Sequence, residues 1–469
     1  MPLICSISGI RGTIGGDSTN ALTPINIVNF ATAFGALLLQ KHANTKPKKI
    51  VIGRDARTTG AMVAGLVANT LQALGFTVID AGLATTPTVE MAVTLEKAVG
   101  GIIISASHNP ANWNALKLLN NLGEFISAED GETLLKIAAN HPEKNIAFTP
   151  YTEIGSYQLV FQRYLVHHIE QIMAQKAIAT NKIKEKKFKV LVDGVNSVGS
   201  IALPALLKTL GCEVIVLNEQ PSGLFPRNPE PLPEHLAETM LAVQKNGCHV
   251  GFVVDPDADR LAIIDENGQW FGEEYTLVAC ADYYLQYVQK GPVVSNLSST
   301  KALRELAAKH GCHYYMSAVG EVNVVAQMKA VQAVLGGEGN GGIIWPDLHY
   351  GRDALAGVAL FLSLMAESGK TCSQLRHQYP NYYMAKQKAE LPSNISVDTL
   401  LERINARYAA THNITTIDGV FIDFGHEWVH LRKSNTEPIV RVYAESRTSE
   451  AAALELANYW RKILVDLVE

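Results

Sequence analysis

The sequence predicts three α/β units followed by a separate α+β domain. Its 469 residues suffice for about three domains of ordinary size, with two or four also consistent. Short apolar, β-branched runs alternate with amphipathic stretches through most of the chain, which is the pattern of α/β units. Residues 419–446 ("GVFIDFGHEWVHLRKSNTEPIVRVYAES") instead alternate apolar and polar residues, as an antiparallel hairpin does.

The first unit contains three apolar runs that we interpret as strands, at residues 48–57, 76–80 and 99–105. A helix is expected from Thr59 to Leu74, between the first two strands. The polar residues 138–155 separate this unit from the next, and a long helix is expected near residues 157–174.

The second unit follows a basic linker at residues 179–189. Its expected strands are residues 188–194, 212–218 and 249–255, and its expected helices are residues 200–210 and 233–246. The expected strands of the third unit are residues 261–268, 291–299, 312–320 and 332–339. The apolar run at residues 354–366 is shorter than the roughly 20 residues of a membrane span, so we expect a buried helix there.

Composition narrows the possible classes of function. The formal net charge of −5 gives no sign of a nucleic-acid or anionic-membrane partner. The N-terminal residues lack the basic start and apolar core of a signal peptide. The six cysteines are far apart and form no CxxC pair, which argues against a zinc site and a disulfide framework. We therefore expect a cytoplasmic protein with reduced thiols.

The first chemical motif lies in residues 101–117 ("GIIISASHNPANWNALK"), where a buried strand runs into a tight Asn-Pro turn. This arrangement presents Ser107 and His108 at the end of the strand, with Lys117 nearby in sequence. A Ser-His-Asp hydrolase is a poor interpretation, because adjacent residues of an extended chain point to opposite sides and no GxSxG motif is present.

The second motif, residues 253–263 ("VVDPDADRLAI"), places Asp255, Asp257 and Asp259 on one side of an extended loop. Three carboxylates so close would repel one another without a cation, and their oxygens suit Mg²⁺. An EF-hand is excluded because Arg260 occupies the position that requires glycine. A solvated acidic turn is the remaining alternative, which the preceding apolar strand disfavours.

Two further motifs have a binding and a structural interpretation. Residues 336–346 ("GGEGNGGIIWP") combine glycines with Glu338 and Asn340, which suits either a polyol-binding loop or a structural turn. Residues 432–438 ("RKSNTEP"), followed by Arg441, are a phosphate cradle or a polar hairpin tip.

These four motifs, in this order, resemble the α-D-phosphohexomutase superfamily over nearly the whole chain, from "GIRG" at residues 9–12 to residues 432–438. The resemblance implies an α/β fold of four domains around a central cleft: three related α/β domains and a C-terminal domain of TATA-binding-protein-like fold. The expected bounds are residues 1–152, 153–254, 255–372 and 373–469.

The resemblance also implies roles for single residues. Ser107 matches the phosphoserine, whose oxygens would complete a metal shell with Asp255, Asp257 and Asp259. His108, Lys117 and Arg11 fall on catalytic positions, Lys117 on a proposed proton-transfer residue. The expected substrate-binding residues are Arg260, Glu338, Asn340, Arg432, Ser434, Asn435, Thr436 and Arg441.

The implied reaction is the isomerisation of a phosphosugar through a bisphosphorylated intermediate. The implied cofactors are one Mg²⁺ per site and a sugar 1,6-bisphosphate activator, and the protein would be a monomer or a homodimer. Enzymes of this superfamily that act on glucose and mannose commonly carry "GEMSGH", whereas this chain has "GEGNGG", with Gly342 in place of the histidine. Together with "VGE" at residues 319–321, this looks more like the phosphoglucosamine mutases.

Three alternatives stay open on the sequence. The first is a phosphomannomutase/phosphoglucomutase. The second is a sugar-bisphosphate synthase or phosphatase, from which the intermediate escapes. The third is a regulatory phosphosugar-binding protein, which is disfavoured because repelling carboxylates would then have no function.

Overall fold

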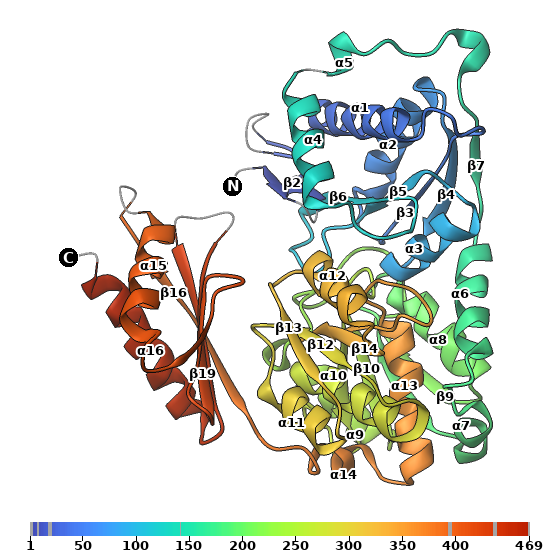
Figure 1. Cartoon of the computed structure of the whole chain (residues 1–469). Coiled ribbons are helices and arrows are strands. Elements are labelled where there is room, and N and C mark those ends of the chain that lie inside the picture. The colour runs from blue at the N-terminus through green and yellow to red at the C-terminus, as the bar shows by residue number, and fades with distance from the viewer. Residues whose placement is uncertain are drawn as a thin grey trace.

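The computed structural model describes residues 3–6, 9–16, 21–140, 142–392, 396–434 and 439–467. Within these ranges the chain forms four sheets, each the centre of one unit (Figure 1). Three units are α/β and the C-terminal unit is an antiparallel sheet with helices, so the predicted fold class is confirmed. Among the described residues no helix is long and apolar enough to cross a membrane.

The first unit is built on a seven-stranded sheet of order β1-β2-β6-β5-β3-β4-β7. Its strands are β1 (Ile4–Ser6), β2 (Gly9–Thr13), β3 (Lys49–Arg54), β4 (Thr77–Leu83), β5 (Gly100–Ile104), β6 (Trp113–Leu119) and β7 (Tyr157–Leu159). Its helices are α1 (Pro24–Lys41), α2 (Gly60–Ala73), α3 (Thr86–Leu95), α4 (Ala128–Ala139) and α5 (Pro142–Asn145), with a 3-10 turn at Tyr151–Glu153. β5 lies between β3 and β6 and is buried along its length, which explains its unbroken apolar run.

The second unit has a four-stranded sheet of order β11-β10-β8-β9. Its elements are α6 (Arg163–Ala174), α7 (Thr180–Lys186), β8 (Lys189–Asp193), α8 (Gly199–Thr209), β9 (Glu213–Leu217), a 3-10 turn (Pro233–His235), α9 (Ala237–Lys245), β10 (Val250–Val254) and β11 (Leu261–Asp265). The helix expected from residue 157 is wrong in its first part. Tyr157 to Leu159 pair with β4 as a parallel edge strand, and the helix begins at Arg163.

The third unit has a four-stranded sheet of order β13-β12-β14-β15. Its elements are α10 (Glu273–Tyr283), a π-helical turn (Tyr284–Val288), β12 (Val293–Asn296), α11 (Lys301–Lys309), β13 (Tyr314–Ser317), α12 (Glu321–Val331), β14 (Leu335–Glu338), β15 (Gly342–Ile344), α13 (Ala354–Ser368) and α14 (Cys372–Arg376). α13 is buried along nearly its whole length, as its apolar sequence predicts. Asp353 caps its first turn.

The C-terminal unit has a five-stranded sheet of order β16-β20-β19-β18-β17, with every pair antiparallel. Its elements are β16 (Tyr383–Glu390), α15 (Val397–Tyr408), β17 (Asn413–Thr415), β18 (Val420–Asp423), β19 (Glu427–Lys433), β20 (Ile439–Ser446) and α16 (Glu450–Asp466). Both helices cover the same sheet face, and Figure 1 shows this unit beside the third unit.

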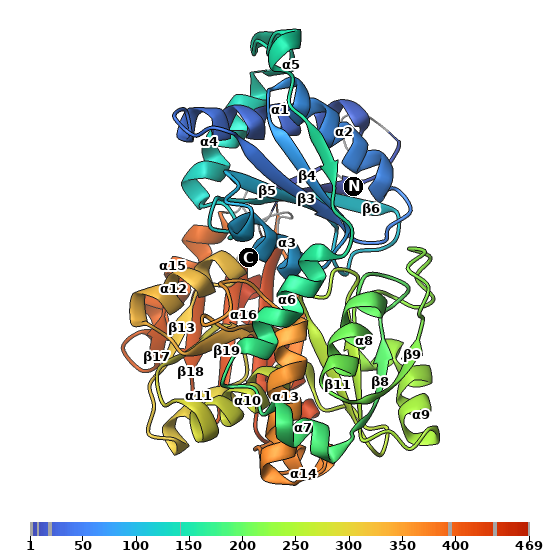
Figure 2. The same ribbon diagram turned by 90° about the vertical axis from the view of Figure 1, so that its right-hand side faces the viewer.

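The expected unit boundaries fall too early. β7 belongs to the first sheet although it follows residue 152, and β11 pairs with β10 although a boundary was expected after Val254. α14 packs into the core beyond residue 372. The cause at β11 is that the Asp255–Asp259 loop is a hairpin connection within one sheet. The largest hydrophobic core joins the second and third units, which lie side by side beneath the first unit (Figure 2).

Candidate active site

The serine loop leaves β5 at Ile104 and turns sharply at Ser107, whose φ of +50° lies in the left-handed region. A non-glycine residue holds this conformation only where its surroundings fix it. Here the backbone N–H of Ser107 donates to Ser105 Oγ at 2.9 Å, and Ser105 Oγ donates to Asp55 at 2.7 Å. The turn therefore fixes the direction of the Ser107 side chain.

Arg57 also holds this loop in place. The residues around Arg57 in the sequence do not predict this role. The fully buried guanidinium donates to Asp55 Oδ2 and to backbone carbonyls around the serine. The acceptors are the carbonyl oxygens of Ser107, Asn109, Pro110 and Trp113, at 2.5, 2.6, 2.6 and 3.1 Å. One side chain thus fixes four carbonyls of the loop, which makes Arg57 a positioning residue for Ser107.

The three aspartates converge in the hairpin between β10 and β11. Asp255, Asp257 and Asp259 are fully buried, and each offers a carboxylate oxygen within 4.8 Å of the others. Ser107 Oγ donates to Asp255 Oδ2 at 2.5 Å, so the serine and the aspartate loop, far apart in sequence, meet in the fold. Burial and the neighbouring carboxylates raise the pKa of Asp255 well above its usual range.

The aspartate cluster has the donor set of a hard-cation site. Asp257 Oδ1 and Asp259 Oδ1 are buried and have no hydrogen-bond partner among the described residues. Buried carboxylate oxygens without donors are costly unless a cation pairs with them. With a Ser107 oxygen beside Asp255, the oxygen-only ligand set fits Mg²⁺.

Lys117 lies on β6 and connects the first unit to this cluster. Its Nζ donates to Asp257 Oδ2 at 2.6 Å and to Asp259 Oδ2 at 3.2 Å. Burial alone would lower the pKa of Lys117, but these two carboxylates raise it above its usual range. Burial would likewise raise the pKa of Asp257, whereas Lys117 and the Thr86 hydroxyl lower it. Lys117 is therefore a fixed positive charge in this arrangement, suited to charge neutralisation.

Arginines from three units gather opposite the serine loop. The pKa of Arg11, on β2, is lowered by burial and by the charges of Arg441 on β20 and Arg260 beside the aspartates. The Nε–H groups of Arg11 and Arg260 are buried and lack hydrogen-bond partners in the described part of the chain, whereas Arg432 Nε forms an ion pair with Asp418. Guanidinium donors left unused in this way suit a bound phosphate.

His108 lies between the serine and these arginines. Its Nδ1 is 3.3 Å from Ser107 Oγ and its Nε2 is 3.9 Å from Glu230. Burial and the charge of Arg260 lower the pKa of His108 to about 2. Glu230 also lies 3.6 Å from Arg260. The imidazole is therefore neutral at physiological pH.

The glycine-rich loop places Glu338 at the end of β14, where it contacts residues outside the loop. The Asn340 amide oxygen instead has its hydrogen bond within the loop. The Glu338 carboxylate accepts from the Asn296 amide and from the Gly320 N–H, while the Asn340 amide oxygen accepts from Gly342 within the loop. Gly341, with φ of +84°, packs so closely that a Cβ would lie 2.4 Å from Leu261 O. This glycine is therefore required by the backbone.

Arg352 is the second unpredicted residue of the site. Its guanidinium donates to Asp259 at 2.7 Å, to Glu321 at 2.9 Å and to Glu338 at 3.1 Å. It therefore links the aspartate loop to the glycine-rich loop at residues 336–346, which together with Glu321 we call the sugar loop. Glu321, which belongs to the predicted "VGE" segment, does reach this network. Burial would lower the pKa of Arg352, but the surrounding carboxylates raise it.

A buried junction of histidines and carboxylates lies directly behind Arg352. Asp353 Oδ2 is 2.8 Å from His168 Nε2 and 3.2 Å from His349 Nε2, and Glu90 is 3.3 Å from His349 Nδ1. Burial would lower the pKa of His349, but Asp353 and Glu90 raise it to about 10. The His349 imidazole therefore joins Glu90 on α3 of the first unit to Asp353 at the start of α13 in the third.

The predicted phosphate loop is described in part. Arg432 and Arg441 are direct cross-strand partners on β19 and β20, and Ser434 is buried at the end of the hairpin. The predicted residues Asn435 and Thr436 lie outside the described residues. The charge of Arg441 acts on Arg11, so Arg441 lies within electrostatic reach of the first unit.

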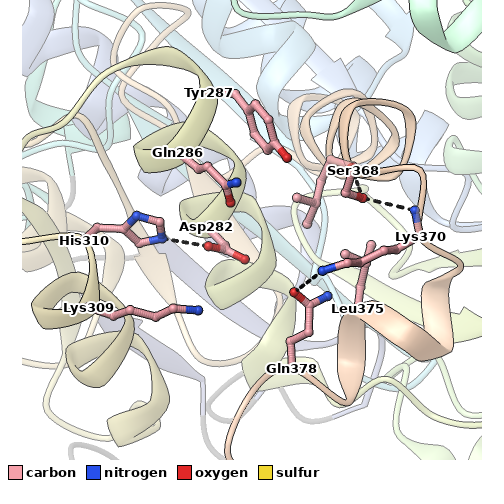
Figure 3. A pocket seen from close by; sticks show the side chains of 10 residues that line it. Asp282, Gln286, Tyr287, Lys309, His310, Ser368, Lys370, Leu375 and Gln378 are labelled. Atoms are coloured by element: carbon pink, nitrogen blue, oxygen red, sulfur yellow. Dashed lines mark hydrogen bonds and ion pairs between the residues drawn. The ribbon is translucent and has the colours of Figure 1, made fainter.

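A separate cavity of about 400 Å³ lies in the third unit, away from these residues (Figure 3). It is lined by Lys309, Lys370, Tyr287 and the amides of Gln286 and Gln378. Asp282 at its wall is paired with His310 at 2.7 Å. None of the predicted site residues lines it, so it does not coincide with the candidate active site.

Comparison with known proteins gives one family for the whole chain. Residues 4–145, 164–268 and 272–383 match phosphoglucomutase/phosphomannomutase alpha/beta/alpha domains I, II and III, and residues 389–462 match the C-terminal domain. A phosphoglucomutase/phosphomannomutase of Thermococcus kodakarensis is 33% identical, covering 94% of this chain and 95% of that protein. A phosphoglucosamine/phosphogalactosamine mutase of Sulfurisphaera tokodaii is 32% identical, covering 97% and 98%.

The fold is also similar to that of a solved structure of this family. The crystal structure of a phosphoglucomutase/phosphomannomutase family protein from Burkholderia thailandensis is similar with a TM-score of 0.82 and 25% identity. The similarity covers 98% of both chains.

Proposed function

Because the chain belongs to the phosphohexomutase superfamily, whose members are isomerases acting on phosphosugars, we propose that it is a phosphoglucosamine mutase. It interconverts glucosamine-6-phosphate and glucosamine-1-phosphate through a phosphoserine enzyme and a 1,6-bisphosphate intermediate. The six free cysteines are consistent with a reducing compartment, and we propose the cytoplasm.

The observation that carries the proposal is the contact between Ser107 and Asp255. A serine fixed in a left-handed turn, with its Oγ 2.5 Å from a buried carboxylate cluster, suits a phosphoryl carrier. In the forward step the bond between Ser107 Oγ and phosphorus breaks and a free sugar hydroxyl forms the new bond to phosphorus, while the proton of that hydroxyl ends, in the net reaction, on Ser107 Oγ. The bisphosphorylated sugar then turns over and returns its other phosphoryl group to Ser107.

Asp255, Asp257 and Asp259 would hold one Mg²⁺, with a Ser107 oxygen as a further ligand. When bound, the ion would supply charge neutralisation for the moving phosphoryl group. Lys117 adds a fixed positive charge beside the same oxygens. Arg57 keeps the serine turn in place, so little reorganisation is needed before transfer.

The phosphate that is not reacting would bind the C-terminal unit through Arg432, Arg441 and Ser434, with Asn435 and Thr436 as further donors. Arg432→Ala is expected to raise KM for the phosphosugar at least about tenfold, since a charge-assisted hydrogen bond contributes on the order of 1.5–3 kcal/mol. Steady-state kinetics measures this effect. The matched control is Lys433→Ala, because Lys433 is adjacent but pairs outward with Asp398. An Arg432→Ala enzyme with the wild-type KM would contradict the role of this loop.

The preference for glucosamine rests on the charge of the sugar loop. Glu321 and Glu338 share the guanidinium of Arg352 with Asp259, so one positive charge faces three carboxylates and does not neutralise them. The remaining negative charge favours a 2-ammonium group over a hydroxyl. Arg352 itself would repel that group, which reduces the advantage expected from the carboxylates alone.

We expect kcat/KM for glucosamine-6-phosphate to exceed that for glucose-6-phosphate and mannose-6-phosphate by roughly ten- to a hundredfold. Parallel kinetics on the three substrates is the test, and Glu321→Gln should narrow the difference. Equal or higher efficiency on glucose-6-phosphate or mannose-6-phosphate would favour the alternative, a phosphomannomutase/phosphoglucomutase, which the similarity to the Thermococcus kodakarensis protein supports.

A further inference from the structure

Asp418 occupies the turn before β18, where the C-terminal unit meets the third unit. The next residue, Gly419, has φ of +72°, and a Cβ there would lie 2.2 Å from Leu431 O and 3.0 Å from Arg432 Cα. Only glycine allows the turn to approach β19 so closely. The backbone therefore brings the Asp418 side chain next to Arg432.

The Asp418 carboxylate contacts both units with one oxygen. Oδ2 lies 3.2 Å from Arg432 Nε as an ion pair, and it accepts a hydrogen bond from the Val319 N–H at 3.0 Å. His430 also contacts this turn, because its Nε2 is 2.6 Å from the Asp418 carbonyl oxygen. The other ring nitrogen of His430 lies 2.9 Å from Ser298 Oγ in the third unit.

Val319 leads directly into the carboxylates of the sugar loop. The next residue, Gly320, donates its N–H to Glu338 at 3.2 Å, and Glu321 accepts from Arg352. A continuous set of contacts therefore runs from Arg432 through Asp418 to Glu338 and Glu321. Its two ends are the proposed ligands of the distal phosphate and of the sugar ring.

We propose that Asp418 is a positioning residue that couples the phosphate-binding Arg432 to the sugar loop and so sets the hexose preference. The inference rests on the proposed function, in which Arg432 binds phosphate and the loop contacts the sugar. A phosphosugar that must bind in two orientations keeps the distance between its phosphate and its ring substituents within narrow limits. The two loops can select among hexoses only if they are held in a fixed relation, and the Asp418 carboxylate contacts Arg432 on one side and the Val319 N–H, next to Gly320 and Glu321, on the other.

The test is the ratio of kcat/KM between the best and the second-best hexose phosphate. Asp418→Ala, or Asp418→Ser if the alanine variant does not fold, removes both contacts and should lower this ratio at least about fivefold. Asp418→Asn keeps an acceptor for the Val319 N–H and should hold the ratio closer to the wild-type value. The control is Asp398→Ala, which removes an exposed carboxylate from the same unit.

A ratio of efficiencies does not change when part of the protein is inactive, so simple destabilisation leaves it unaffected. A wild-type ratio in the alanine or serine variant would overturn the inference. The proposed function is tested by other measurements, so its failure can be told apart from failure of the role of Asp418. The hexose order of the wild-type enzyme tests the substrate, and Arg432→Ala tests the phosphate ligand, whatever Asp418 does.

Discussion

Ser107→Ala is expected to reduce turnover by about three orders of magnitude or more, because in the proposed mechanism it removes the atom that carries the phosphoryl group between the two half-reactions. Intact mass spectrometry of the active wild-type protein should show a species ~80 Da heavier than the bare chain, and the variant should lack it. Arg57 and Ser105 fix the backbone of the loop rather than the hydroxyl, so the variant should still fold.

The matched control is Ser127→Ala. Ser127 is an exposed serine of the same unit that caps α4, and its loss should cost about 1 kcal/mol of stability without affecting the phosphorylated species. Wild-type turnover in Ser107→Ala would exclude the phosphoserine mechanism and leave the contact with Asp255 as a structural hydrogen bond.

Asp257→Asn is expected to lower kcat by at least about a hundredfold and to raise the Mg²⁺ concentration needed for half-maximal activity. The amide removes one negative charge from the metal shell and also weakens the ion pair with Lys117 at 2.6 Å. Titration of activity with Mg²⁺ after treatment with EDTA measures both effects.

Asp282→Asn is the control for this experiment, because Asp282 is also buried and lies 2.7 Å from a side-chain nitrogen, that of His310, but belongs to the separate cavity of the third unit. Its Mg²⁺ dependence should match that of the wild type. An Asp257→Asn enzyme that resists EDTA as well as the wild type does would contradict the proposed metal site.

The parts of the site that could be predicted are those carried by local sequence. The serine turn, the alternating aspartates and the arginine pair each show their chemistry within a few residues, and the fold brings Ser107, Asp255 and Lys117 together. Arg57 and Arg352 could not be predicted in the same way. Apart from Asp55, which is two residues from Arg57, their partners are backbone carbonyls and carboxylates 14 to 93 residues away, and an isolated arginine in sequence shows none of them.

The elements of the fold also divide into those that local sequence predicts and those that depend on distant partners. The helix over residues 59–74 and the buried helix after Asp353 follow from their own patterns, and both are confirmed. β7 and β11 were misassigned because their places depend on pairing with β4 and β10. All three residues of β7 are exposed, so this strand buries no apolar face and its place in the sheet depends on backbone pairing with β4.

The central claim is that the phosphoryl group on Ser107 passes to the sugar and returns. The most direct test labels the phosphoserine with ³²P, mixes the enzyme with unlabelled glucosamine-6-phosphate and follows the label on both protein and sugar. Radioactivity is expected to leave the protein and to appear in sugar phosphate, passing through the 1,6-bisphosphate. Label that stays on Ser107 while glucosamine-1-phosphate accumulates would contradict it.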